Sequence, residues 1–329
     1  MGSSSNHFRS TAFAFLVVLT FVWVVSPVIA RPVEGSDEKT TLSRFHRIAV
    51  STLGYVHDND GVMPLAHSFD NNSRIWRLSS YTVVPEGWTD SAERSKPKRI
   101  EEDHSMVLNA IRDYGAAPKD YEAAGMADFD VGFKSAARKG TLFKPTKVSV
   151  LYNGELHNWS MNAVATPSRL PLFTQGFKEN RIGAGISFPT LCCTSIGPDC
   201  RFNPGGYPQG GQTSCAYYGP HYGDIWFISA SKPNWSVWAY GHRLVFVRVD
   251  GSVESRKTEV PTWPKSSKNA NDSPWSSFEG PALTGAPYWM TACVSPDKPM
   301  DEKSVYYMGY YRPDSKFDYR TDQCDFGTK

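Results

Sequence analysis

The first residues to consider for chemistry are a histidine and a carboxylate in the run GHRLVFVRVDGSV, His242 and Asp250. They are eight residues apart, and an extended strand rises about 3.3 Å per residue, so they would lie about 26 Å from each other. In that geometry they cannot share a proton. The sequence also lacks the G-x-S-x-G, H-E-x-x-H and phosphate-loop motifs. An exported hydrolase, one alternative function, would therefore need a histidine and an aspartate brought together by the fold.

Aromatic side chains offer a second kind of chemistry, the stacking of rings on sugars. Four tryptophans lie in the C-terminal half of the chain: Trp226, Trp235, Trp238 and Trp289. Exposed on one plane, they would form the platform typical of carbohydrate-binding modules. The competing interpretation is that they pack in the core, because large aromatic side chains dominate the energetics of burial. An extracellular protein that binds polysaccharide is therefore a further alternative.

Six cysteines could form disulfides or bind a metal. They are Cys192, Cys193, Cys200, Cys215, Cys293 and Cys324. The sequence has no C-x-x-C pair, although thiolate zinc sites usually use such short spacings. An even number of cysteines in an exported chain favours disulfides, but sequence alone does not choose the pairing. Cys293–Cys324 is compatible with loop closure, and the adjacent Cys192 and Cys193 are expected to bond to different partners.

The run from Asp58 to Gly61, which reads DNDG, resembles the beginning of a calcium-binding loop. An EF-hand loop needs a glycine at its sixth position and an acidic residue at its twelfth. Counted from Asp58, these positions hold Met63 and Phe69. The run is therefore predicted to end a helix, because asparagine and glycine accept the left-handed conformation found there. The sequence predicts no metal and no other cofactor.

The N-terminal segment has the pattern of an export signal. Arg9 precedes a stretch from Ser10 to Ala30 that contains no charged residue. A basic start, an apolar centre and a V-x-A ending are typical of a secretory signal peptide, so cleavage is predicted after Ala30. The alternative is a retained membrane anchor, because twenty helical residues rise about 30 Å. Either way, the chain is expected to be exported, with residues 31–40 as a flexible linker and 41–329 as a single domain.

Hydrophobic periodicity predicts the elements that would position these residues. A helix is predicted from Leu42 to Tyr55, because Phe45 and Ile48 belong to an apolar stripe with three- and four-residue spacing. A second helix is predicted from Ile100 to Tyr114. Strands are predicted at 147–152, 170–174, 224–229 and 243–249, with a two-residue hairpin turn at Asp250 and Gly251. Loop insertions are expected at about 190–220 and 255–287.

The charge balance limits the partners. The chain has 35 Lys and Arg against 33 Asp and Glu, a formal net charge of +2. Such a balance argues against a nucleic-acid partner. Hydrophobic residues make up 40% of the chain, which argues against disorder of the whole chain.

Several segments, taken in order, resemble the bacterial pseudopilin-like exported proteins, which have a prepilin-type N-terminus and a C-terminal signature running from histidine to Asp-Gly. Ser43 to Leu65 resembles the family's helix ending NLRQIGLALxxYxxDxxGxxPP. The other partial matches are Leu142–Pro145 to fxCPsD, Trp159–Asn162 to SYxMN, Pro167–Phe173 to PsrtvLfxE and Gly241–Val253 to HxGGxNxxFxDGHV. The chain lacks the G-F-T-L-I-E prepilin cleavage site and a glutamate in the apolar segment, which argues against filament assembly.

This resemblance implies an α+β, pilin-like fold, in which an N-terminal helix packs on an antiparallel β-sheet and long loops are joined by disulfides. It also implies a non-enzymatic structural or secretion-associated protein of the cell envelope, similar to components of type II secretion. Its partners would be envelope or secretion-system proteins. Contact with a membrane is expected only through the N-terminal segment.

Overall fold

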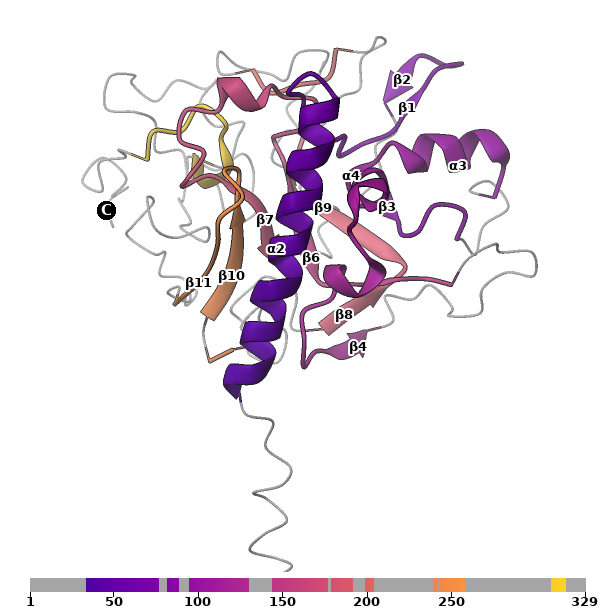
Figure 1. Cartoon of the computed structure of the whole chain (residues 1–329). Helices are drawn as coiled ribbons and strands as arrows, with labels where there is room; N and C mark the ends of the chain where they lie inside the picture. Colours follow the sequence, from indigo (N-terminus) through magenta and orange to yellow (C-terminus); the bar gives the residue numbers. More distant parts are fainter. Residues whose placement is uncertain are drawn as a thin grey trace, which may run out of the picture.

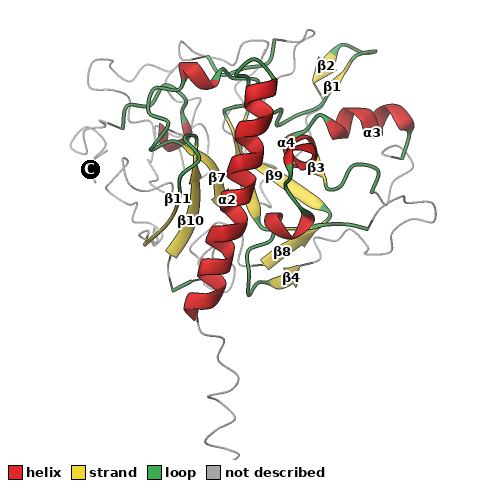
Figure 2. Cartoon of the chain, in the orientation of Figure 1, coloured by secondary structure: helices red, strands yellow, loops and turns green. Residues whose placement is uncertain are grey.

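The computed structural model describes residues 34–76, 82–88, 95–129, 144–176, 179–191, 199–203, 240–241, 243–257 and 309–317. These residues form both helices and sheets, which confirms the α+β class (Figure 1; Figure 2). The helical elements are α2 (Glu34–Asp58), α3 (Pro97–His104), α4 (Val107–Ala110) and the 3-10 turns η1 (Ile111–Tyr114), η2 (Pro118–Tyr121), η3 (Met161–Ala163) and η6 (Gly309–Tyr311). The predicted signal segment and the predicted strand at 224–229 lie outside the described residues.

The helix α2 confirms the predicted amphipathic helix but begins earlier than expected. Residues 34–40, predicted to belong to a flexible linker, form its first turns. One reason is a tertiary contact, since the Arg243 side chain donates to the Glu38 carboxylate at 2.9 Å. The predicted end is confirmed at Asp58, where Asp60 and Gly61 have positive φ angles of 54° and 78°. The Gly61 amide donates to a carbonyl of the last helical turn.

The predicted helix from Ile100 to Tyr114 is wrong as a continuous element, because it breaks into α3, α4 and η1. At the break Met106 is extended, with φ −83° and ψ 149°, and forms a β-bridge with Leu65. The neighbouring Val107 amide donates to the Leu65 carbonyl at 2.9 Å. Met106 is 1% exposed, so this segment bends in order to bury it. The predicted end at Gly115 is confirmed, with φ 102°.

The larger sheet has six strands in the order β11-β10-β7-β6-β9-β3, and a smaller sheet has the order β4-β8-β5. The strands are β1 (Phe69–Asp70), β2 (Ile75–Trp76), β3 (Thr82–Val83), β4 (Ala127–Phe129), β5 (Lys147–Val148), β6 (Val150–Gly154), β7 (Pro171–Gln175), β8 (Glu179–Ile182), β9 (Ala184–Thr190), β10 (Arg243–Arg248) and β11 (Val253–Lys257). The expected antiparallel pairing is found along β11, β10, β7 and β6, but β6 pairs in parallel with β9 and β4 with β8. After β7 the chain crosses to the smaller sheet, where it forms β8. It then returns to the larger sheet as β9, which runs parallel to β6.

The predicted strand 147–152 is divided between the two sheets, as β5 and β6. Ser149 lies at the division, and its amide donates to the Tyr121 carbonyl at 2.9 Å. The strand predicted at 170–174 is confirmed as β7 within one residue. The loop expected from residue 255 begins later, because β11 continues to Lys257 and pairs along β10.

The hairpin formed by β10 and β11 is confirmed, although its loop is longer than predicted. Phe246 lies opposite Glu254, and Val247 lies opposite Val253. The loop has three residues, because the Arg248 amide donates to the Ser252 carbonyl and the Gly251 amide donates to the Arg248 carbonyl. Gly251 has a φ angle of 86°, the left-handed conformation that this type of loop requires.

The core forms where α2 packs against β10, β11, η1 and η2, as predicted for the helix and the hairpin (Figure 1). Phe45 and Ile48 of α2 are fully buried, as are Phe173 of β7 and Phe246 of β10. Every residue of β6 and β7 is buried, so both faces of the sheet centre are covered. Full burial of one such side chain contributes about 1.5–3 kcal/mol.

Candidate functional site

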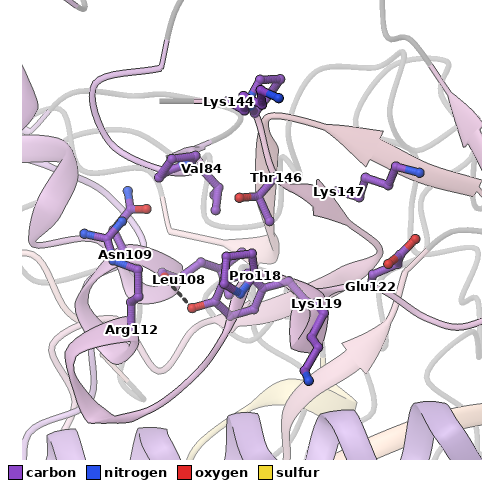
Figure 3. A pocket seen from close by; sticks show the side chains of 13 residues that line it. Val84, Leu108, Asn109, Arg112, Pro118, Lys119, Glu122, Lys144, Thr146 and Lys147 are labelled. Atoms are coloured by element: carbon purple, nitrogen blue, oxygen red, sulfur yellow. Dashed lines mark hydrogen bonds between the residues drawn. The ribbon is translucent and has the colours of Figure 1, made fainter. Parts of the chain in front are cut away.

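A cavity of about 570 Å³ lies between the residues that follow β3, the segment from α4 to η2, and the chain that leads into β5 (Figure 3). Small-molecule sites usually have volumes of about 300–1,000 Å³. Part of the lining is apolar, with Val84, Leu108 and Tyr121 buried. The Tyr121 hydroxyl donates to the Leu108 carbonyl at 2.7 Å, and burial raises the pKa of this phenol. Tyr121 therefore contributes a neutral ring to the wall.

Basic side chains surround the same cavity, which we call the basic cavity. They are Arg112 from η1, Lys119 from η2, Lys144 from the chain that leads into β5, and Lys147 from β5 itself (Figure 3). Glu122 is the one acidic residue among those that line it, and it lies 3.5 Å from the Arg44 guanidinium of α2. The lining of the basic cavity thus carries an excess of positive charge.

The four cations differ in how they are compensated. The Lys147 ammonium lies 2.9 Å from the Asp128 carboxylate, and this hydrogen bond raises the pKa of Lys147. Arg112 binds the Glu86 carboxylate through two hydrogen bonds, one of them at 2.9 Å. Lys119 and Lys144 are exposed, and neither forms an ion pair with another residue in the described ranges. Among the described residues, these two lysines therefore carry the charge of the basic cavity that no ion pair compensates.

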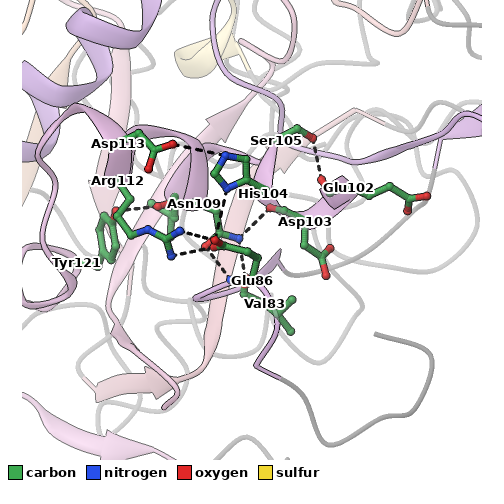
Figure 4. Close-up of polar contacts among 11 residues, drawn as sticks. Val83, Glu86, Glu102, Asp103, His104, Ser105, Asn109, Arg112, Asp113 and Tyr121 are labelled. Atoms are coloured by element: carbon green, nitrogen blue, oxygen red, sulfur yellow. Dashed lines mark hydrogen bonds and ion pairs between the residues drawn. The ribbon is translucent and has the colours of Figure 1, made fainter. Parts of the chain in front are cut away.

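Behind Arg112, the side chain of Glu86 is the centre of a polar network (Figure 4). Glu86 is 6% exposed, and its amide donates to the Asn109 side-chain oxygen at 3.2 Å. The Asn109 side-chain nitrogen donates to the carbonyls of Val83 and Asp103 at 2.9 and 2.8 Å. A buried carboxylate is costly unless it is paired and hydrogen-bonded, and Arg112 meets that need here. This network fixes one wall of the basic cavity.

His104 lies between two carboxylates of the same network, the arrangement that would invite an acid–base interpretation (Figure 4). Its ring nitrogens are 3.4 Å from Glu86 and 3.5 Å from Asp113, which is long for hydrogen bonds. Ser105 does not contact the imidazole as a nucleophile would, because its hydroxyl donates to the Glu102 carbonyl at 2.7 Å. The geometry therefore describes a polar network around the Arg112–Glu86 ion pair rather than a Ser-His-Asp arrangement.

A pair of histidines lies in the interior, where the ring centroids of His67 and His157 are 5.5 Å apart. His157 is fully buried, and its Nδ1 accepts the Ala66 amide at 2.8 Å. Burial lowers the pKa of His67 to about 4 and also lowers that of His157, which is further lowered by the neighbouring His67. Both rings are therefore neutral at pH 7. Within the described part of the chain, no three His, Cys, Asp or Glu residues are placed to hold a metal ion.

Most of the residues singled out from the sequence lie outside the described residues. These are His242, the tryptophans Trp226, Trp235, Trp238 and Trp289, and the cysteines Cys192, Cys193, Cys215, Cys293 and Cys324. Cys200 is described, is fully buried beside Trp76, Leu191 and Phe202, and is not a free thiol. Asp250 and Gly251 form the hairpin loop, where the Asp250 carboxylate accepts hydrogen bonds from Ser252. None of these described residues reaches the basic cavity.

The sequence interpretation missed the basic cavity. Its cations occur at positions 112, 119, 144 and 147, of which the first was predicted in a helix, the last at the start of a strand, and the other two in no predicted element. Only the fold brings these segments together. The Thr146 amide donates to the Val84 carbonyl at 2.9 Å, the Ser149 amide donates to the Tyr121 carbonyl at 2.9 Å, and Arg112 binds Glu86. No spacing motif in the sequence indicates this contact.

Comparisons with known proteins identify no relative. No family model matches the chain, and neither a curated protein nor a solved structure is similar to it. Within the described ranges, no helix combines the length and the apolar character needed to cross a membrane.

Proposed function

We propose that this chain is an exported, non-enzymatic, pilin-like protein of the cell envelope, with a structural or secretion-associated role. The observation that carries the proposal is the position of α2, which begins at Glu34, four residues after the uncharged stretch that ends at Ala30. The 25 residues of α2 extend for about 37 Å at 1.5 Å per residue. Where the apolar segment is retained as an anchor, the long amphipathic helix that follows it gives the arrangement expected of a pilin-like stalk.

The burial pattern of α2 supports this role. Phe45, Ile48 and Ala49 are fully buried against the domain, whereas Ser43 and His46 on the other side are exposed. An envelope protein whose helix carries a domain needs one face for that domain and one polar face for water or partner proteins. Envelope or secretion-system proteins are the partners we propose for the exposed face.

Oxidised cysteines are part of the same proposal. Cys200 lies in a buried cluster and is not a free thiol, and the other five cysteines complete an even set. In an exported chain we expect all six to form disulfides that hold the long loops. Because a buried cysteine behaves as a small apolar residue, Cys200 also contributes to the packing around Trp76.

Cell fractionation tests the proposal. We expect the full chain in the membrane or extracellular fraction, with no free thiols in a labelling experiment and a mobility shift on reduction. A variant that lacks residues 10–30 should remain in the cytosol. A full-length chain found in the cytosol with six reactive thiols would refute the proposal.

A conservative substitution in α2 serves as the control for the deletion. The substitution Thr40→Ser, at an exposed position of α2, keeps the hydroxyl that donates to the Ser36 carbonyl at 2.8 Å. This variant should distribute as the unaltered chain does. The alternative of polysaccharide binding stays a prediction, because the four tryptophans that it needs lie outside the described residues.

A further inference from the structure

We propose that the basic cavity binds a small organic anion, a carboxylate or phosphate group carried on a compact and partly apolar body. This inference concerns a different part of the molecule from the proposed envelope role and does not depend on it. It rests on the charge, the walls and the rigidity of the cavity.

The charge of the cavity is a local excess rather than a reflection of the whole chain. The chain is nearly balanced, with 35 basic and 33 acidic residues, whereas four basic residues and one acidic residue line the cavity. Arg112, Lys147 and Glu122 each have an ion-pair partner at 3.5 Å or less. An anion would therefore meet Lys119 and Lys144, whose charges no other described residue compensates, without first breaking an ion pair.

The walls define the body of the ligand. Val84, Leu108 and Tyr121 are buried side chains that face a space large enough for a sugar-sized molecule, about 570 Å³. The Asn109 side chain, which also lines the cavity, is fully engaged by Glu86, Val83 and Asp103. Recognition would therefore come from the lysines at the rim and from apolar contact with the walls.

The cavity is held in place before a ligand arrives. The Thr146 amide donates to the Val84 carbonyl at 2.9 Å, and the Gly183 amide donates to the Thr146 carbonyl at 2.7 Å. On the opposite side the Arg112–Glu86 pair fixes η1. A preformed site binds more tightly, because little conformational entropy is lost on binding.

Calorimetry on the full chain tests the proposal with two acids and one neutral control. The probes are glucuronate for the carboxylate, glucose 6-phosphate for the phosphate, and glucose as the uncharged ring. At low ionic strength we expect at least one of the two acids to bind and glucose not to bind. The ratio of the affinities for the two acids shows whether the cavity prefers a carboxylate or a phosphate. The affinity should fall as salt is added, because exposed charges are screened.

Two double variants locate the binding. The double variant Lys119→Gln/Lys144→Gln should lower the affinity for the acid by about 10-fold, since each exposed ion pair contributes modestly to binding. Lys39→Gln/Lys257→Gln removes the same charge from the exposed positions Lys39 of α2 and Lys257 of β11, and should change the affinity less than about 2-fold. Both variants should melt like the unaltered chain, because all four side chains are exposed.

Amine labelling supplies an independent readout. Bound acid should protect Lys119 and Lys144 from acetylation and leave Lys39 unprotected. The proposal is overturned if neither acid binds at millimolar concentration, if both double variants weaken binding equally, or if the two cavity lysines are not protected.

Discussion

Replacing Phe246 with alanine measures how much the hairpin contributes to the core. Phe246 is fully buried in β10, and its ring lies 4.8 Å from the Arg248 guanidinium and 5.1 Å from that of Arg256. Its ring centroid is also 6.4 Å from that of Tyr310, in an edge-to-face contact. A buried Phe→Ala change costs about 3–5 kcal/mol. Because the two cation–π contacts are also lost, at about 0.5–1 kcal/mol each, we expect the upper half of that range.

Urea unfolding followed by circular dichroism measures this loss. With a slope of about 2 kcal/mol per molar urea, a loss of about 4 kcal/mol moves the midpoint down by about 2 M. The matched control is Asp250→Asn in the same hairpin, where the side-chain oxygen still accepts the Ser252 amide, 3.0 Å away in the unaltered chain. This control should change the free energy of unfolding by less than about 0.5 kcal/mol. A loss below about 1 kcal/mol for Phe246→Ala, or an equal loss for Asp250→Asn, would show that the hairpin is not part of the core.

Three further predictions concern the histidine pair, the hairpin loop and the Glu86 network. The pKa of buried His67 is lowered to about 4 from about 6.5 when unfolded, so the unfolded chain binds the proton more tightly. The free energy of unfolding should be at its full value above about pH 6.5 and should fall by about 3 kcal/mol as the pH drops to 4. Urea unfolding at several pH values measures this, and a free energy that does not change with pH would contradict it. Gly251→Ala should lower the free energy of unfolding by about 1–3 kcal/mol, because Gly251 has a φ angle of +86° and a Cβ there would lie 2.7 Å from the Leu53 side chain. An unchanged melting temperature would contradict this prediction. Arg112→Met should cost about 3 kcal/mol by leaving Glu86 buried without its cation, and Arg112→Met/Glu86→Gln should recover part of the loss.

The sequence predicted the elements whose stability is local. The stripe that contains Phe45 and Ile48 defined α2, and the left-handed residues near Gly61 defined its end. The first turns of α2 were missed, since Glu38 is held by Arg243, which is 205 residues away in the chain. The prediction of a continuous helix across Met106 was wrong for the same kind of reason. The β-bridge between Met106 and Leu65, a contact between distant residues, outweighs the local helical pattern.

The candidate site was not predictable from periodicity or motifs. Lysines such as Lys119 and Lys144 read as ordinary solvated residues, and nothing in their spacing indicates that they share a cavity. Their proximity depends on β5, a two-residue strand that separates from β6 at Ser149. Periodicity joined β5 and β6 into one strand, and so gave no sign that the chain near Lys147 belongs to a separate sheet.

The helix α2 and the basic cavity are mechanically connected, although they were inferred from different observations. Arg47 of α2 lies 2.7 Å from the buried Asp120 of η2, and Asp120 in turn accepts the Ala117 amide at 3.0 Å. Arg44, one turn earlier in α2, donates to the Glu122 carbonyl at 2.9 Å. Because η2 supplies Lys119 and Tyr121 to the cavity, the helix proposed as a stalk also holds one of its walls. Any displacement of α2 along its axis would therefore move a wall of the basic cavity, whereas the opposite wall at Thr146 is held by hydrogen bonds to Val84 and Gly183.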